Sequence, residues 1–278
     1  MIRLGAQVSQ ARGYEVAIRE AGDAGLRALQ VFSRSPVGGQ SKGLPKANSL
    51  KPVLRAAGIE VLYVHAPYFV NPAALDSEKL QRARSALKQE MRRAKRLSGD
   101  YVVLHPGHWQ TDLGREAAKA AFVGTVVEML EAPGRVLIEN TAGQGRELGA
   151  TWEELGAIFQ SLGLTRRVGL MLDTAHAMAS GHPLKSRDDT MKLFELIEKN
   201  VGVRRVAGIH LNDSLYPVGS HRDRHAHLLE GVLGAAALQQ ILVWAKDTSC
   251  PLILETPGRD IGQRTADLET IEGLSQEV

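Results

Sequence analysis

The sequence predicts an α/β fold, a single-domain (β/α)8 barrel that spans residues 1–278. Eight short apolar runs alternate with longer segments of helical periodicity. The last six of these runs end 34 to 45 residues apart, and a strand followed by a helix and two loops needs about 30 residues or more. Residues 6–13, which include the end of the first run, lack the glycine-rich phosphate turn that is typical of an open, doubly wound sheet. A closed barrel is therefore favoured over an open sheet.

The predicted strands are rich in Leu and β-branched residues. They are Leu4–Val8, Leu26–Phe32, Ile59–His65, Tyr101–His105, Arg135–Glu139, Val168–Asp173, Val206–His210 and Leu252–Glu255. Helices are predicted over segments that include Ser77–Leu97, Glu116–Leu130, Trp152–Leu162 and Ala235–Lys246. Thr151 is the predicted N-cap of the third of these helices. We find no domain boundary, and we interpret Ser33–Asn48 as a loop over the barrel mouth.

The composition excludes several classes of protein. Hydrophobic residues make up 44% of the chain and charged residues 23%, which is typical of a globular protein and not of a disordered or fibrous one. The single cysteine, Cys250, cannot form an intrachain disulfide. No apolar run approaches the roughly 18 residues of a membrane span, and the start has no signal-peptide pattern, so we expect a cytoplasmic protein. The net charge of +3 permits an anionic partner without predicting one.

Acidic residues and histidines gather where the predicted strands end. In a (β/α)8 barrel these ends face the active-site mouth. The third to eighth predicted strands end, in order, at His65, His105, Glu139, Asp173, His210 and Glu255. Converging carboxylates repel one another unless a cation lies nearby, so we expect a metal centre here rather than a set of buried ion pairs. Histidines combined with carboxylates favour zinc, with manganese or iron as competitors, over magnesium or calcium.

Three further candidate ligands lie on the loops that follow the sixth and seventh strands. They are His176, Asp223 and His225. The stretch from Asn212 to Gly234 is long for a barrel loop, which favours a functional role. These residues could hold another metal with an open position, although a DxH pattern on a loop is a weak signal by itself.

Seven segments occur in one order across almost the whole chain. They are Val64–Tyr68, His105–Gly107, Ile138–Gly145, Leu172–His176, Ile209–Asp213, Asp223–His225 and Leu252–Thr256. Together they resemble the endonuclease IV family of apurinic/apyrimidinic (AP) endonucleases, DNA-repair enzymes with a (β/α)8 fold and a trinuclear metal centre. The most discriminating segments are Ile138–Gly145, which contains Glu139 and a Gly-Gln-Gly motif, and the Asp-Arg-His motif Asp223–His225, called the DRH loop below. All nine metal-ligand positions of the family hold matching residue types.

The resemblance implies three metal sites that share one bridging carboxylate. His65, His105 and Glu139 would hold the first metal, Glu139, Asp173, His210 and Glu255 the second, and His176, Asp223 and His225 the third. Three Zn2+ per chain are expected, with Mn2+ or Fe at one or more sites as the alternative. Glu139 and Glu255 are then the catalytic residues, and the nucleophile is a hydroxide that bridges two metals. The implied reaction cuts double-stranded DNA 5′ to an abasic site and leaves a 3′-hydroxyl and a 5′-deoxyribose phosphate. We expect a monomer.

Two DNA contacts are also implied. Tyr68 matches a position that inserts into the DNA stack beside the flipped abasic nucleotide, and its alternative role is ordinary packing at the loop rim. Arg224 lies within the DRH loop. One departure affects DNA binding but not the metal chemistry: Val37 and Gly39 stand where the family usually has an arginine that enters the DNA and a tryptophan.

Two other functions compete with this interpretation. A metal-dependent sugar isomerase or epimerase would share the barrel and the set Glu139, Asp173, His210 and Glu255, but would not need the five other candidate ligands. In a catalytically silent protein that binds damaged DNA, some metal-ligand positions would be occupied by residues that cannot bind a metal, and none is so occupied in this sequence.

Overall fold

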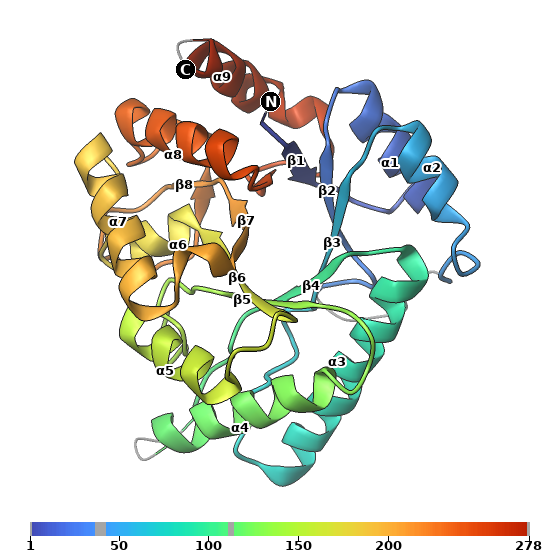
Figure 1. The fold of residues 1–278 in the computed structure, drawn as a ribbon, viewed down its shortest axis with the longest axis vertical. Coiled ribbons are helices and arrows are strands. Elements are labelled where there is room, and N and C mark those ends of the chain that lie inside the picture. The colour runs from blue at the N-terminus through green and yellow to red at the C-terminus, as the bar shows by residue number, and fades with distance from the viewer. Residues whose placement is uncertain (1, 37–42, 111–113, 277–278) are drawn as a thin grey trace.

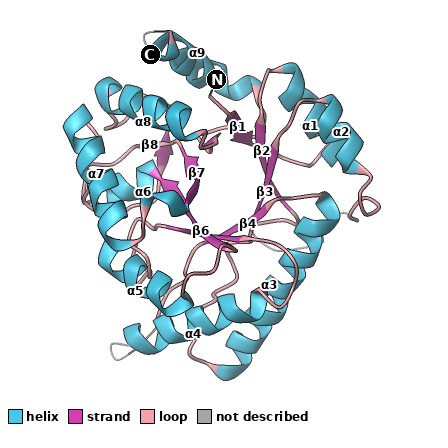
Figure 2. Ribbon diagram, viewed as in Figure 1, coloured by secondary structure: helices cyan, strands magenta, loops and turns pink. Residues whose placement is uncertain are grey.

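The computed structural model describes residues 2–36, 43–110 and 114–276. Within these ranges, eight parallel strands form a closed barrel in the order β1-β10-β7-β6-β5-β4-β3-β2. Helices surround the ring of strands (Figures 1 and 2). The predicted (β/α)8 barrel is confirmed.

The barrel strands agree closely with the predicted runs. They are β1 (Leu4–Gln7), β2 (Ala28–Phe32), β3 (Val61–His65), β4 (Tyr101–Leu104), β5 (Val136–Glu139), β6 (Val168–Asp173), β7 (Val206–His210) and β10 (Leu252–Leu254). The predicted starts at Leu26 and Ile59 were too early. Each of these residues belongs instead to the turn that closes the preceding helix. Each follows a glycine of positive φ, and its N–H donates to a carbonyl five residues back in that helix.

Eight helices lie outside the barrel in the described residues. They are α1 (Tyr14–Asp23), α2 (Leu50–Ala56), α3 (Ser77–Leu97), α4 (Arg115–Met129), α5 (Trp152–Leu162), α7 (Arg187–Asn200), α8 (Ala235–Thr248) and α9 (Thr265–Ser275). Helices α3 and α5 have the predicted bounds, and the Thr151 hydroxyl accepts from the Glu154 N–H at 3.3 Å as the predicted N-cap. Among the described residues, none of the helices combines the length and the apolar character that a membrane span requires.

Several short elements were not predicted. Helix α6 (Thr174–Ala179) follows β6 directly, and β8 (Asp213–Ser214) pairs antiparallel with β9 (His225–Ala226). Two short 3-10 turns, η1 (Val203–Arg205) and η2 (Gly262–Arg264), precede β7 and α9. Elements of two to six residues are too short to carry a periodic pattern.

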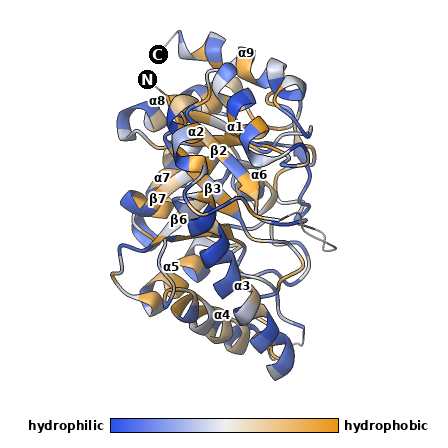
Figure 3. Cartoon of the chain, turned by 90° about the vertical axis from the view of Figure 1, so that its right-hand side faces the viewer, coloured by the Kyte–Doolittle hydropathy of each residue, from blue (hydrophilic) through white to orange (hydrophobic). Residues whose placement is uncertain are grey.

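The core has two layers. The larger one fills the space between the strands and the helices. Much of α3 is hydrophilic in Figure 3. The smaller one lies inside the barrel and consists of Ala28, Tyr63, Val103, Leu137, Met171 and Ile253. At the end of the barrel opposite the mouth, the Tyr63 hydroxyl donates to the Ala207 carbonyl at 2.7 Å. Because apolar side chains fill this end, the polar residues of the interior lie at the other end.

The loop after β2 is described only in part. Val37 and Gly39 lie outside the described residues. Before them, Arg34 Nε donates to a carboxylate oxygen of the buried Glu90 on α3 at 2.5 Å, and the Ser33 hydroxyl donates to the other oxygen. These contacts attach the start of the loop to α3.

Candidate metal centre

The structure brings all nine predicted ligands together at the mouth of the barrel. Six of them end a barrel strand or directly follow one, on β3 to β7 and on β10: His65, His105, Glu139, Asp173, His210 and Glu255. His176 lies in the first turn of α6, Asp223 in the β8–β9 connection and His225 in β9. The ligand atoms of three groups lie within 4.8 Å of one another, namely His65, His105 and Glu139; Asp173, His176 and His225; and Glu139, Asp173, His210 and Glu255. The first and third groups are those predicted.

Glu139 lies between two groups of histidines. Its Oε2 is 3.1 Å from Nε2 of His65 and 3.1 Å from Nε2 of His105. Its Oε1 is 2.8 Å from Nδ1 of His210. The side chain is 0% exposed, and although burial alone would raise its pKa, the surrounding histidines hold the pKa of Glu139 well below its ordinary value. The two oxygens of one carboxylate thus face two different sets of candidate ligands.

His210 is surrounded by carboxylates. Its Nδ1 lies 3.2 Å from Glu255 Oε2 and 3.9 Å from Asp173 Oδ2, in addition to the contact with Glu139. Burial lowers the pKa of His210, but Glu139 and Glu255 raise it more, to about 9. Three buried or nearly buried acidic groups around one imidazole attract positive charge to this point, either a proton or a metal ion.

The group that contains His176 and His225 differs slightly from the predicted set of His176, Asp223 and His225. Asp223 Oδ1 lies 3.3 Å from Nε2 of His176 and 3.4 Å from Nε2 of His225, as expected. Asp173 Oδ2 also approaches His225 Nε2, at 3.7 Å. This nitrogen is buried and has no hydrogen-bond partner. A buried nitrogen without a partner is costly, and a metal ion would satisfy it.

Backbone carbonyls fix the orientation of three of the imidazoles. His65 Nδ1 donates to the carbonyl oxygen of Ala66 at 2.7 Å. In the same way, His176 Nδ1 donates to the carbonyl oxygen of Asn140 at 2.9 Å. His225 Nδ1 donates to that of Glu255 at 3.3 Å. A carbonyl oxygen only accepts, so Nδ1 carries the hydrogen in each ring and the Nε2 lone pair faces the centre. Metal-binding histidines have this arrangement, and the donor set therefore fits divalent metal ions.

Comparisons with known proteins identify the family. Residues 18–276 match the xylose isomerase-like TIM barrel family. A probable endonuclease 4 from Chlorobium phaeovibrioides is 36% identical over 263 residues, which cover 92% of this chain and 94% of the relative. The chain belongs to the endonuclease IV family.

Other relatives agree with the family assignment. A probable endonuclease 4 from Heliobacterium modesticaldum is 36% identical over 259 residues, covering 92% of this chain and 93% of the relative. The crystal structure of endonuclease IV from Thermus thermophilus superposes with a TM-score of 0.85 at 30% identity, covering 99% of this chain and 100% of that one. A D-tagatose 3-epimerase-like protein, at 18% identity and a TM-score of 0.74, covers 100% of this chain and 98% of its own and shares the fold alone. The resemblance of the sequence motifs to endonuclease IV is thus confirmed.

Three buried amide side chains of this endonuclease IV homologue support the candidate ligands and were not predicted. Asn140 Oδ1 accepts from the Asp173 N–H at 2.7 Å, and Asn212 Nδ2 donates to Asp173 Oδ2 at 2.7 Å. Gln30 Nε2 donates to Glu255 Oε1 at 2.6 Å. The two asparagines stand within quoted motifs, which could have pointed to them. For Gln30 the available signal was a polar residue inside the apolar run Ala28–Phe32.

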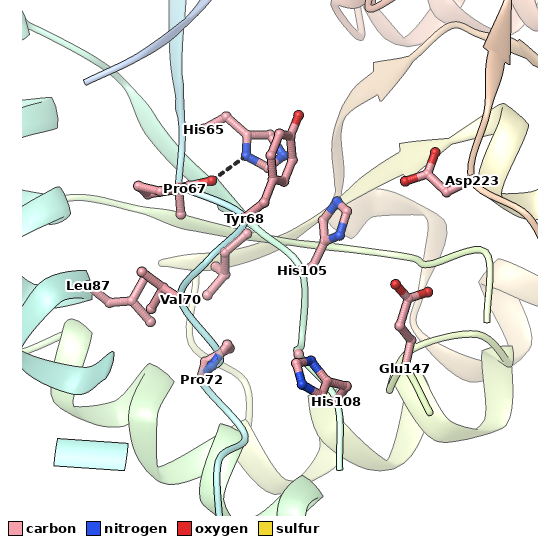
Figure 4. A pocket seen from close by; sticks show the side chains of 13 residues that line it. His65, Pro67, Tyr68, Val70, Pro72, Leu87, His105, His108, Glu147 and Asp223 are labelled. Carbon is pink, nitrogen blue, oxygen red and sulfur yellow. Dashed lines mark hydrogen bonds between the residues drawn. The ribbon is translucent and has the colours of Figure 1, made fainter. Parts of the chain in front are cut away.

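A pocket of about 210 Å³ opens beside the first group of candidate ligands. In Figure 4, His105 lies between Tyr68 and Asp223, and Glu147 and His108 lie below them. Tyr68 is 58% exposed, and its ring centroid is 5.4 Å from that of Phe32 and 5.3 Å from that of His65. Arg224 is exposed, and its Nη1 donates to the Asp223 carbonyl at 2.5 Å. Both predicted DNA contacts thus belong to the region around the candidate metal centre.

Proposed function

We propose that this endonuclease IV homologue is a metal-dependent AP endonuclease that hydrolyses the phosphodiester bond 5′ to abasic sites in double-stranded DNA. In this proposal residues 1–278 act as one catalytic domain, as a monomer in the cytoplasm. The observation that carries it is the position of Glu139, whose two carboxylate oxygens face separate histidine groups. A site for one metal does not need such a carboxylate, whereas a site in which two metals share a ligand does.

The proposed ligands are those of the sequence analysis. His65, His105 and Glu139 would hold one Zn2+, Glu139, Asp173, His210 and Glu255 the second, and His176, Asp223 and His225 the third, with Mn2+ or Fe as the alternative. Imidazole nitrogens and carboxylates in these numbers suit zinc. When bound, the metal ions lower the pKa of a shared water and neutralise charge on the phosphate.

The proposed reaction is a single displacement at phosphorus. The oxygen of a water bonds to phosphorus as that water gives up a proton, the bond from phosphorus to O3′ breaks, and O3′ takes up a proton, so that the net reaction consumes one water. The products are a 3′-hydroxyl and a 5′-deoxyribose phosphate. Glu139 and Glu255 are the proposed catalytic residues, because Glu139 joins the two groups and Glu255 Oε2 lies 3.2 Å from His210 Nδ1, where it can orient the attacking water.

Two residues are proposed to contact the DNA. The exposed ring of Tyr68 at the edge of the pocket would stack beside the abasic nucleotide, where one base is already missing and unstacking costs less. Arg224, exposed beside Asp223, would contact a phosphate.

A sugar isomerase or epimerase is the competing function, and only the fold supports it. Such an enzyme would use the group around His210 and would have no role for His176, Asp223 and His225. The closeness of these three side chains, at 3.3 and 3.4 Å, favours the endonuclease. A silent DNA-binding protein would gain nothing from keeping nine ligands.

The test combines metal analysis with a nicking assay. Protein purified without chelator should contain about three metal ions per chain and nick a duplex with one abasic analogue, and it should leave the matched undamaged duplex intact. The end groups of the products, read on a sequencing gel, report the side of cleavage. One metal ion per chain together with no nicking would refute the proposal and favour the isomerase.

A further inference from the structure

Gln30 is a buried polar residue inside an otherwise apolar strand. It occupies the middle of β2, whose other residues are Ala28, Leu29, Val31 and Phe32, and it is 0% exposed. A buried carboxamide without hydrogen bonds costs about 1–3 kcal/mol. Its presence in the barrel interior therefore requires partners, and the strand places those partners at the candidate metal centre.

Both ends of the Gln30 carboxamide contact candidate ligands of the second metal. Its Nε2 donates to Glu255 Oε1 at 2.6 Å, and its Oε1 lies 2.9 Å from His210 Nε2. The ionised carboxylate of Glu255 only accepts hydrogen bonds, so the amide nitrogen must face it. The amide oxygen then faces His210, and His210 Nε2 must be the donor.

This arrangement determines which atoms remain for a metal. With its hydrogen on Nε2, the neutral imidazole of His210 has its lone pair on Nδ1, which lies 2.8 Å from Glu139 Oε1 and 3.2 Å from Glu255 Oε2. Glu255 Oε1 is occupied by Gln30, so Oε2 is the oxygen that faces the group. In contrast to the other three oriented histidines, His210 thus presents Nδ1, and a side chain takes the place of the backbone carbonyl.

We infer that Gln30 is a positioning residue of the second metal site, which fixes the tautomer of His210 and the carboxylate of Glu255 at the same time. The inference rests on the proposed function, because it presupposes that these residues bind a metal. Partners of metal ligands in this role typically affect metal affinity by about 10- to 100-fold. Gln30 should therefore act on one metal site and not on all three.

The experiment measures zinc retained per chain against increasing concentrations of a competing chelator, by elemental analysis. Gln30→Met keeps the approximate volume and removes both hydrogen bonds. Gln30→Glu keeps an acceptor for His210 but places a second carboxylate against Glu255. Tyr63→Phe is the matched control, since it removes one buried hydrogen bond inside the same barrel, at the opposite end. Circular dichroism of each variant checks the fold, and the visible spectrum of the cobalt-substituted protein reports the ligand geometry.

Gln30→Met and Gln30→Glu should lose one of three zinc ions at about 10- to 100-fold lower chelator concentration than the parent, with an altered cobalt spectrum. Tyr63→Phe should lose stability while retaining zinc and the spectrum of the parent. If the parent retains three zinc ions and nicks abasic DNA while both Gln30 variants hold zinc equally well, the role of Gln30 is refuted and the proposed function stands. An equal loss in Tyr63→Phe also refutes the role, because it would reflect a general loosening of the barrel. A parent without zinc and without nicking activity refutes both.

Discussion

The side-chain nitrogen of Asn212 donates to Asp173 Oδ2 over 2.7 Å, and both residues are fully buried. The oxygen of the same carboxamide accepts from the Glu255 N–H at 2.8 Å. One amide therefore connects the ends of β6 and β10, which are not neighbours in the sheet. This link holds the carboxylate of Asp173 and the backbone of Glu255, and both residues are candidate ligands.

Asn212→Asp should weaken metal retention. The new carboxylate would face Asp173 Oδ2 across the distance of a former hydrogen bond, and like charges at this distance repel. We expect about 10- to 100-fold easier removal of zinc by chelator, measured by elemental analysis. Asn200→Asp on α7, where the side chain donates to the Leu196 carbonyl, is the control and should retain the metals. Equal retention in both variants would show that the Asn212 amide is replaceable.

Glu139→Gln should abolish nicking and leave the fold intact. The substitution keeps the volume but removes the charge that faces His65, His105 and His210. Fewer than three metal ions per chain should remain, and the melting temperature of the metal-loaded protein should fall because ligand binding to the native state stabilises it. Nicking at the rate of the parent would contradict a shared metal ligand at this position.

The metal-free protein should lose stability as the pH rises toward 9. Glu139 and Glu255 raise the folded pKa of His210 to about 9 against the opposing effect of burial, and an unfolded histidine has a pKa of about 6.5. Protonated His210 therefore contributes stability that is full below about pH 6.5 and is lost as the pH rises through the folded pKa. The pKa values of His105 and His176 are raised as well.

The measurement is the urea midpoint of chelator-treated protein between about pH 6.5 and 9.5. It should decrease over this range, and more steeply than that of zinc-loaded protein, in which metal ions take the place of the protons. A midpoint of the metal-free protein that stays level or increases would contradict the arrangement of carboxylates around His210.

The sequence was sufficient to predict the barrel because each unit carries its own local signals. Runs such as Val168–Asp173 are apolar on both faces, and Thr151 caps the helix that precedes this run. The errors at Leu26 and Ile59 arose because an apolar residue in the turn after a helix cannot be distinguished, in the sequence, from the first residue of a buried strand. Helix α6 and the β8–β9 pair depend on contacts at the mouth, which no periodic pattern records.

The convergence of the candidate ligands was also predictable, because parallel strands in a barrel end at one face. The supporting amides were not. Gln30 and Glu255 are 225 positions apart in the sequence, and only barrel closure brings β2 and β10 to opposite sides of β1. The approach of Asp173 to His225 depends in the same way on how the β8–β9 pair folds over the mouth.

Cys250 should resist alkylation in the native protein. The thiol is 4% exposed, and burial raises its pKa to about 12, so almost no reactive thiolate exists at pH 8. Iodoacetamide should label the protein only after urea unfolding, as measured by intact mass. Stoichiometric labelling of native protein at the rate of a free thiol would contradict the packing of the segment before β10.

Tyr68→Ala should weaken the binding of an abasic duplex without a comparable effect on the chemical step. A base–aromatic contact is worth roughly 1–3 kcal/mol, so Kd or KM should rise by about 5- to 150-fold, while kcat at saturating DNA should fall less. Tyr68→Phe is the matched control, because it keeps the ring and should bind nearly as well as the parent. The ring also packs against Phe32 and His65, and a role limited to packing would lower the melting temperature of Tyr68→Ala and leave Kd unchanged at every salt concentration. Because phosphate contacts weaken with salt and stacking depends on it less, the ratio of Kd values between Tyr68→Ala and the parent should persist between low and high salt if Tyr68 stacks at the lesion.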